Sequence, residues 1–284
     1  MAAPRHSSLA IRQSLVRFGH LCFDDFLLLS AETLDIGRWT PDLISDWTLA
    51  TNNAPHVLTH FRHSEPVLAS SLCNLASGLA SAAPVGQCVP SLDQVCAAQS
   101  RLVNAFAYEL LRSKAPPLYD ALPWQDWDFS IVAKRFKLWQ TRFLLAGDGT
   151  TVTMCRCRKS AGVYVVEPDE AIASYIELKC AREKVRRFKL LRAGLDHIPL
   201  PDDSTDLAVV GSIPEGLTAS ALTELTRVAA NVLIVENNPL SSPLVEAPMT
   251  DAGFRPGTVG VSGLGPRRCW WLMNKLEVRN PKLD

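Results

Sequence analysis

The second half of this sequence predicts an α/β domain built on a mostly parallel sheet, and we expect a helical portion before it. From about residue 139, short apolar runs alternate with segments of helical character. Such alternation is typical of parallel strands that helices cover on both faces. Before residue 130, apolar side chains instead recur at helical spacing. The chain of 284 residues is 47% apolar, which is enough for packed cores and too much for a disordered protein.

The helical portion is expected over residues 23–130. Thr40 followed by Pro41 is typical of a helix start, because a threonine side chain caps free N–H groups and proline suits the first helical position. The clearest helix is predicted over residues 92–112, where one face stays apolar. No alternating pattern of β type appears in this portion of the sequence.

Four apolar runs predict the parallel strands, at residues 142–146, 162–166, 206–210 and 231–235. Two helical segments are expected between them, at residues 169–185 and 218–230. Each run is short and nearly free of polar residues, as in strands that are buried on both faces.

The end of the sequence predicts an antiparallel hairpin, formed by residues 259–262 and 269–273 around a glycine-containing turn. The α/β domain is therefore expected over residues 139–275, with a tail at 276–284. Three tryptophans are expected to pack the helical portion against the sheet, because their rings suit a domain boundary: Trp124, Trp127 and Trp139.

The formal net charge of zero hides three regions of unequal charge. Residues 1–130 hold 8 basic and 12 acidic residues, residues 131–192 hold 14 and 6, and residues 193–284 hold 7 and 11. We call residues 134–192 the basic band. Four of its cations are spaced to form one stripe on a helix: Lys179, Arg182, Arg186 and Lys189. The band is interpreted either as a solvated surface or as a contact for RNA or a protein complex.

The first 22 residues contain three arginines and no acid, a composition typical of a mitochondrial transit peptide. An ordinary amphipathic surface helix is the alternative. The first interpretation predicts a mitochondrial destination and the second a cytoplasmic one. No run approaches the roughly 20 apolar residues of a membrane helix, so no membrane span is expected.

The cysteines and histidines predict no metal site. Eight cysteines scattered through a chain of this size are interpreted as reduced thiols. Cys155 and Cys157 have the spacing of neither a redox pair nor a zinc site. His56, His60 and His63 would share one helical face, but no acid nearby in the sequence orients them, and a solvated or partner-facing helix is expected.

A ligand site is predicted where the first two strands of the α/β domain end. Gly147-Asp148-Gly149 follows the first strand, and its glycines let the chain turn sharply and bring backbone N–H groups close to a ligand. Glu167 follows the second strand. An acid at that position of a parallel sheet is placed to accept hydrogen bonds from the hydroxyls of a ribose.

These features resemble the class I S-adenosylmethionine-dependent methyltransferases, a family with a Rossmann-like, doubly wound fold, over residues 139–275. The resemblance implies that Gly147, Asp148 and Gly149 lie beneath the amino-acid moiety of S-adenosylmethionine, and that Glu167 holds its ribose. The segment 195–207 looks like the family's loop that passes the adenine, which places Asp196 or His197 near that ring. A closing antiparallel strand also fits the family.

The sequence departs from the family's pattern at several points. Thr151 stands near the family's third glycine, and Gly194 stands where many members carry an acid that contacts the adenine, with Asp196 displaced by two residues. Residues 211–215 contain no Asn-Pro-Pro-aromatic motif, and no catalytic residue is identified. Because the sulfonium is already activated, methyl transfer does not require a catalytic base.

Two functions follow from this pattern. The first is S-adenosylmethionine-dependent methyl transfer to an unidentified acceptor. The second is a non-catalytic subunit or assembly factor with the same fold, which would dock on a mitochondrial RNA–protein or protein complex through the basic band. The retained glycine turn and Glu167 favour the first, and the departures favour the second.

Overall fold

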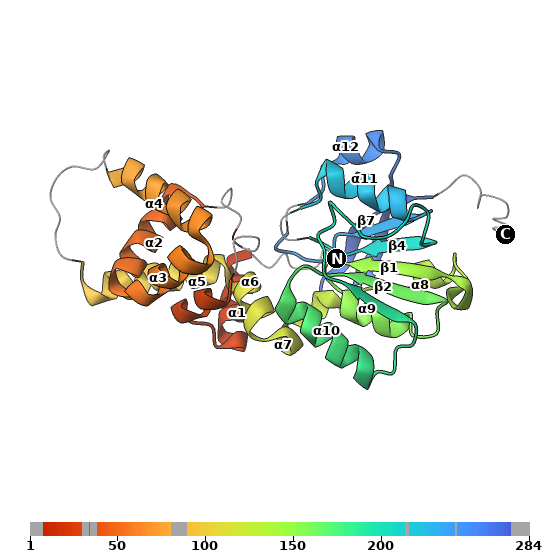
Figure 1. Cartoon of the computed structure of the whole chain (residues 1–284), viewed down its shortest axis with the longest axis horizontal. Helices are drawn as coiled ribbons and strands as arrows, with labels where there is room; N and C mark the ends of the chain where they lie inside the picture. Colours follow the sequence, from red (N-terminus) through yellow and green to blue (C-terminus); the bar gives the residue numbers. More distant parts are fainter. Residues whose placement is uncertain are drawn as a thin grey trace. The chain divides into compact units, whose positions relative to one another are not determined.

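The computed structural model describes residues 8–29, 34, 39–80, 90–213, 216–241 and 243–273. The chain divides between Tyr119 and Asp120 into two compact units, a helical unit and an α/β unit (Figure 1). Residues 120–138, most of which we had expected in the helical portion, belong to the α/β unit. The expected tail at 276–284 lies outside the described residues.

The helical unit consists of short helices joined by tight connections. They are α1 (Ser8–Gly19), η1 (Phe23–Leu28), α2 (Pro41–Asn53), α3 (Pro55–Ser64), α4 (Pro66–Ala80), α5 (Leu92–Ala105), α6 (Ala107–Lys114) and α7 (Pro116–Asp120), which ends at the boundary. The side chain of Thr40 caps α2 as predicted, accepting a hydrogen bond from the backbone N–H of Leu43 at 3.3 Å. The helix predicted over 92–112 is interrupted at Phe106, which leaves helical geometry and separates α5 from α6.

An aromatic core holds the helical unit together. The Trp47 ring on α2 lies 5.3–5.9 Å from the rings of four other aromatic residues, Phe23, Phe26, Trp39 and Phe61. At the edge of this core, Arg101 on α5 donates two hydrogen bonds to the Asp46 carboxylate on α2, at 2.6 and 2.7 Å. This bidentate pair raises the pKa of Arg101.

Helix α1 forms part of the helical unit. Arg12 on α1 donates a hydrogen bond to the backbone carbonyl of Ala105, and Leu15 is 2% exposed. Helix α1 thus packs on α5 and α6. The mitochondrial destination stays a prediction.

We expect Arg12→Met to destabilise the helical unit by about 1 kcal/mol, because the charged donor to the Ala105 carbonyl is lost from a half-buried position. Arg17→Met on the exposed side of the same helix is the control and should change the free energy of unfolding by less than about 0.5 kcal/mol. Urea denaturation of both variants measures the difference. Equal effects would contradict a packed role for α1.

The α/β unit is built on one seven-stranded sheet in the order β3-β2-β1-β4-β5-β7-β6. Its strands are β1 (Arg142–Ala146), β2 (Gly162–Val166), β3 (Phe188–Leu191), β4 (Leu207–Val210), β5 (Val232–Val235), β6 (Arg255–Val261) and β7 (Gly265–Leu272). Its helices are η3 (Pro123–Gln125), α8 (Ser130–Ala133), η4 (Leu138–Gln140), α9 (Thr150–Arg156), α10 (Glu170–Arg182), α11 (Ala219–Val228) and α12 (Glu246–Asp251). The first five strands run parallel, and β7 lies antiparallel to both β5 and β6. The mostly parallel sheet and the closing hairpin are therefore confirmed.

Helices cover both faces of the sheet, with α9 and α10 on one side and α11 and α12 on the other (Figure 1). All residues of β1 after Arg142 are buried, as are all residues of β4 and β5. This explains why these strands are continuous apolar runs in the sequence. None of the described helices is both long and apolar enough to cross a membrane.

The register of the sheet brings its strand ends together at one edge. Ala146 at the end of β1 pairs with Val166 on β2 and with Val210 on β4. Val166 pairs in turn with Leu191 on β3, and Val210 with Ile234 on β5. The residues that follow these five positions therefore line the carboxyl edge, and this edge contains the candidate site.

Candidate functional site

The candidate site lies where the strand order reverses. β1 is flanked by β2 and β4, and open α/β sheets bind ligands outside the carboxyl ends of the strands at such a switch point. The register places Gly147, Glu167, Arg192 and Gly211 directly after four aligned strand residues. The glycine turn and Glu167, which lie 18 residues apart in the sequence, thus follow neighbouring strands.

The glycine turn needs glycine because other parts of the chain approach it closely. Gly147 and Gly149 have φ angles of +71° and +82°, a region that residues with a side chain rarely adopt. A Cβ on Gly147 would lie 2.8 Å from the Gly211 carbonyl oxygen, and one on Gly149 would lie 2.6 Å from the Gln125 carbonyl oxygen. The glycine turn therefore packs against Gly211 at one end and against Gln125 at the other.

The loops after β1, β4 and β5 are joined by hydrogen bonds. The N–H of Asp148 donates to the Ser212 carbonyl at 3.1 Å, and the N–H of Ser212 donates to the Asn237 side chain at 2.9 Å. The Ser212 hydroxyl accepts from the N–H of Asn238 at 2.9 Å. Asp148 is 3% exposed. The loops that follow β1, β4 and β5 are therefore held against one another by direct hydrogen bonds.

A segment that precedes the sheet, residues 120–128, lies over the glycine turn. The N–H of Gly149 donates to the side-chain oxygen of Gln125, and the Trp127 ring nitrogen lies 3.3 Å from the position of a Gly149 Cβ. The Asn237 side chain donates to the Trp124 carbonyl at 2.8 Å. Gln125 is 1% exposed, and its side-chain nitrogen has no hydrogen-bond partner in the described part of the chain.

The start of this segment is fixed by Asp120. Its carboxylate accepts hydrogen bonds from the Thr151 hydroxyl on α9 and from the Tyr175 hydroxyl on α10, the latter at 2.8 Å, and it pairs with the Lys179 ammonium. The side chains of Asp120 and Lys179 are 9% and 11% exposed. Burial, together with the hydrogen bond to Asp120, raises the pKa of Tyr175. Thr151, which stands near the position of the third glycine in the resemblance, therefore holds residue 120 in place.

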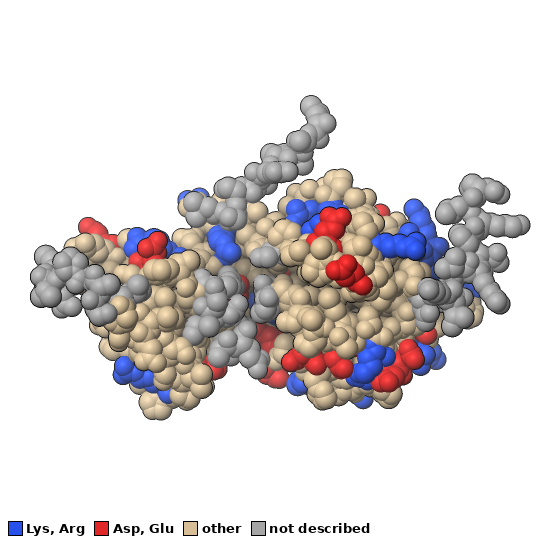
Figure 2. Space-filling model, turned by 90° about the horizontal axis from the view of Figure 1, so that it is seen from above, with Lys and Arg blue, Asp and Glu red and all other residues tan. Residues whose placement is uncertain are grey.

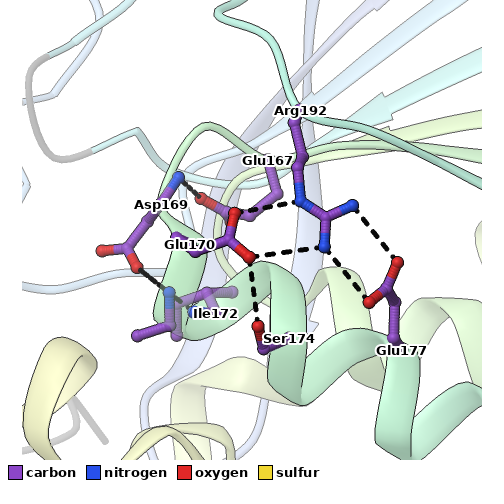
Figure 3. Close-up of polar contacts among 8 residues, drawn as sticks. Glu167, Asp169, Glu170, Ile172, Ser174, Glu177 and Arg192 are labelled. Atoms are coloured by element: carbon purple, nitrogen blue, oxygen red, sulfur yellow. Dashed lines mark hydrogen bonds and ion pairs between the residues drawn. The ribbon is translucent and has the colours of Figure 1, made fainter.

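Glu167 is buried at the end of β2, with 4% exposure. Its backbone N–H donates to the Leu191 carbonyl and its carboxylate accepts from the N–H of Asp169, both at 3.0 Å. Figure 3 shows Glu167 beside an exposed ion-pair cluster in which Arg192 bridges Glu170 and Glu177, at 2.9 and 3.1 Å. Hydrogen bonds within this cluster raise the pKa of Arg192 and lower that of Glu170.

The two residues predicted to lie near the adenine are both exposed. Asp196 folds back on its own loop, so that its carboxylate oxygen lies 2.6 Å from the position of a Cβ on Gly194. The displaced acid thus occupies the space that a side chain at position 194 would take. His197 follows it, and no hydrogen bond between either side chain and the glycine turn occurs within the described residues.

An ion pair holds the loop that carries Asp196. Arg227 on α11 donates to the carbonyls of Ile198 and Leu200 at 2.9 and 2.8 Å, and Glu224 accepts from the N–H of Ile198 at 3.0 Å. The hydrogen bond from Arg227, followed by that from Ile198, lowers the pKa of Glu224 to about 2. The loop is therefore fixed at its far end, while Asp196 stays accessible.

Sequence reasoning missed Asp120 and Gln125. They contact residues that are 31 and 24 positions away in the sequence, and neither belongs to a motif. The only signal near them was the pair Trp124 and Trp127, which we had assigned to a boundary between domains. Both tryptophans are buried in the α/β unit, but Trp139 is 64% exposed, so its predicted packing role is wrong.

Ion pairs and turns divide the basic band. Several of its cations have acidic partners within the α/β unit: Arg142, Arg156, Lys179, Arg182 and Arg192. The predicted helical stripe is wrong, because α10 ends at Arg182, Arg186 lies in the following loop and Lys189 lies on β3. On the face seen in Figure 2, the described basic and acidic side chains of this unit lie interspersed.

Nine other cations of the band are exposed and form no ion pair in the described ranges: Lys134, Arg135, Lys137, Arg158, Lys159, Lys184, Arg186, Arg187 and Lys189. In the helical unit, His56 pairs with Asp24 at 2.9 Å and His63 contacts the Thr59 carbonyl at 2.8 Å. No cluster of three metal-binding side chains occurs among the residues that the structure describes.

The strand order decides the fold family. Five parallel strands in the order β3-β2-β1-β4-β5 are completed by an antiparallel β7 inserted between β5 and β6, with the glycine turn after β1 and an acid after β2. The α/β unit has the class I methyltransferase fold.

Comparisons with solved structures find similar proteins at low identity. A methyltransferase from Aquifex aeolicus, described as dependent on S-adenosylmethionine, is 24% identical, with 52% of this chain and 88% of that chain covered and a TM-score of 0.41. The YcgJ protein of Bacillus subtilis is 14% identical (45% and 68% covered, TM-score 0.38). Geranyl diphosphate C-methyltransferase from Streptomyces coelicolor, solved with S-adenosylhomocysteine, is 10% identical (45% and 49% covered, TM-score 0.33). No family model and no curated sequence matches this chain.

The two halves of the site differ in how they fit S-adenosylmethionine. The nucleoside half retains an acid after β2, Glu167, and an accessible carboxylate, Asp196, beside Gly194. In the half expected to hold the amino-acid moiety, Gln125 already accepts the hydrogen bond from the N–H of Gly149. The acids present are of the kind that a ribose and an adenine require, whereas the Gln125 side chain occupies the N–H of Gly149 in the half that the resemblance assigns to the amino-acid moiety.

Proposed function

We propose that the α/β unit binds S-adenosylmethionine and transfers its methyl group to an acceptor that is not identified. The observation that carries this proposal is the alignment of strand ends, which sets the glycine turn after β1 beside Glu167 after β2 at the switch point of the sheet. Ligands bind at this point in open α/β sheets.

The roles of individual residues follow the resemblance. Glu167 would hold the ribose hydroxyls, since a carboxylate accepts several hydrogen bonds and that of Glu167 is oriented by the N–H of Asp169. The carboxylate of Asp196 would accept a hydrogen bond from the amino group of the adenine, and His197 would lie beside it. The glycine turn from Gly147 to Gly149 would face the amino-acid moiety. The bound cofactor supplies an activated methyl group, so that the protein needs only to hold and align the reactants.

A titration with S-adenosylmethionine tests the proposal. We expect heat of binding from the wild-type protein and about tenfold weaker binding by Glu167→Ala, which corresponds to the loss of hydrogen bonds to a charged acceptor. Glu177→Ala is the matched control, because this exposed acid on α10 pairs with Arg192 and should leave the affinity unchanged. The absence of binding heat at millimolar S-adenosylmethionine would contradict the proposal. If Glu167→Ala binds as tightly as the wild type, the placement of the ribose is wrong.

The second candidate is a non-catalytic subunit or assembly factor of a mitochondrial RNA–protein or protein complex. The contact of Gln125 with Gly149 favours it, because the N–H of Gly149 is then not available to the amino-acid moiety. The nine cations of the basic band that form no ion pair in the described ranges would supply the docking surface. RNA binding that weakens as salt rises would support this candidate, because neutralised phosphates release counterions. Mass spectrometry of the organellar protein would test the destination and any cleavage.

A further inference from the structure

Only one of the two polar groups of the Gln125 side chain has a hydrogen-bond partner in the described part of the chain. Its carboxamide oxygen accepts a hydrogen bond from the N–H of Gly149, while its NH2 group is buried without a partner in the described part of the chain. An unmade hydrogen bond of a buried donor destabilises the arrangement that buries it. A single hydrogen bond therefore holds this side chain in a position where its NH2 group is buried without an acceptor.

The backbone around Gln125 is fixed much more firmly than the side chain. The preceding carbonyl, of Trp124, accepts from Asn237, and Arg156 binds both Asp126 and the Trp127 carbonyl. Further along, the N–H of Asp128 donates to the Gly260 carbonyl at 2.8 Å. A rotation of the Gln125 side chain would break none of these contacts.

A ligand carboxylate would compete with this side chain on favourable terms. The N–H of Gly149 needs an oxygen acceptor, and a charged carboxylate forms a stronger hydrogen bond with an N–H than a neutral carboxamide does. Gly149 also lacks a Cβ, so its N–H is not shielded by a side chain of its own.

We propose that the Gln125 carboxamide stands in for the carboxylate of S-adenosylmethionine at Gly149 and must turn away when the cofactor binds. Gln125 is then a selectivity residue. It weakens the binding of ligands that carry the amino-acid moiety and does not change the binding of nucleosides without that moiety. This inference rests on the proposed function, because it assumes that the carboxylate of the cofactor reaches the glycine turn.

Two variants with opposite expected effects test the inference by calorimetry on the full chain, with S-adenosylmethionine and adenosine as ligands. Gln125→Ala removes the internal acceptor, and we expect three- to tenfold tighter binding of S-adenosylmethionine. Gln125→Glu replaces it by a charged one, and we expect at least tenfold weaker binding. Adenosine should bind the wild type and both variants equally.

The outcomes separate the inference from the proposed function. If Gln125→Ala binds S-adenosylmethionine no more tightly than the wild type while adenosine binds all three proteins, the inference is overturned and the nucleoside site stands. If neither ligand binds any of the three proteins, both are overturned. Thermal unfolding of each variant checks its fold. Should Gln125→Ala not fold, Gln125→Glu decides alone, since unchanged affinity for S-adenosylmethionine would contradict the inference.

Discussion

Asp120→Ala is expected to destabilise the α/β unit by about 3 kcal/mol, the range measured when one member of a buried ion pair is removed. The substitution leaves the Lys179 ammonium, 11% exposed, without its carboxylate, and it removes the acceptor of the Thr151 and Tyr175 hydroxyls. The cost is high because a buried charge without a partner loses its hydration and gains nothing in return. The same substitution releases the start of the segment that covers the glycine turn.

Asp202→Ala is the control for this prediction. Asp202 likewise forms an ion pair, with Arg227, but the Asp202 side chain is 76% exposed. Ion pairs at the surface contribute about 0–1 kcal/mol to stability. Chemical denaturation followed by tryptophan fluorescence would report both variants, since Trp124 and Trp127 are buried in the α/β unit. A loss for Asp120→Ala no larger than that for Asp202→Ala would show that Asp120 does not anchor the segment.

The four central parallel strands of the α/β unit could be predicted because they are buried on both faces. β1, β2, β4 and β5 are continuous apolar runs, and the observed strands differ from the predicted ones by at most one residue at an end. The same physical cause makes them recognisable and places them centrally in the sheet. The candidate site followed from this, because carboxyl ends of aligned parallel strands meet at one edge.

The edge strand β3 was not predicted. Its sequence, Phe188–Leu191, includes the exposed Lys189 and follows a run of arginines, so it lacks the apolar continuity of the central strands. A lysine on an edge strand is a common protection against pairing with other chains. The spacing of the cations instead suggested a continuous helix, which the left-handed residues Lys184 and Arg187, with φ angles of +54° and +55°, rule out.

The details of the site could not be predicted, because they depend on contacts between distant residues. The contact from Asp120 to Lys179 spans 59 positions, and that from Asn237 to Trp124 spans 113. No periodicity or local motif encodes such pairs. The departure at Gly194 shows the same limit, since only the fold of the loop reveals that the Asp196 carboxylate returns to the space beside it.

Gly211→Ala is expected to destabilise the α/β unit by about 3 kcal/mol, at the upper end of what overpacking a well-packed site costs. Its new Cβ would lie 1.8 Å from the Asp148 carbonyl oxygen and within 2.8 Å of the carbonyl carbon and the nitrogen of the same residue. All three atoms belong to the backbone, so that no side-chain rotation relieves the clash. The loops after β1 and β4 would have to separate, which breaks the hydrogen bond from Asp148 to Ser212.

Gly216→Ala in the same loop separates this clash from backbone strain. Gly216 has a φ of +85° and no atom within 4 Å of a Cβ, so its replacement should cost only about 1 kcal/mol of conformational strain. The sequence around Gly211 contains no Asn-Pro-Pro-aromatic motif. What the fold requires there is the absence of a side chain, because the turn that begins at Gly147 closes directly on it. If Gly211→Ala unfolds no more easily than Gly216→Ala, the two loops are not held together as described, and the glycine turn is open to a ligand from the side of β4.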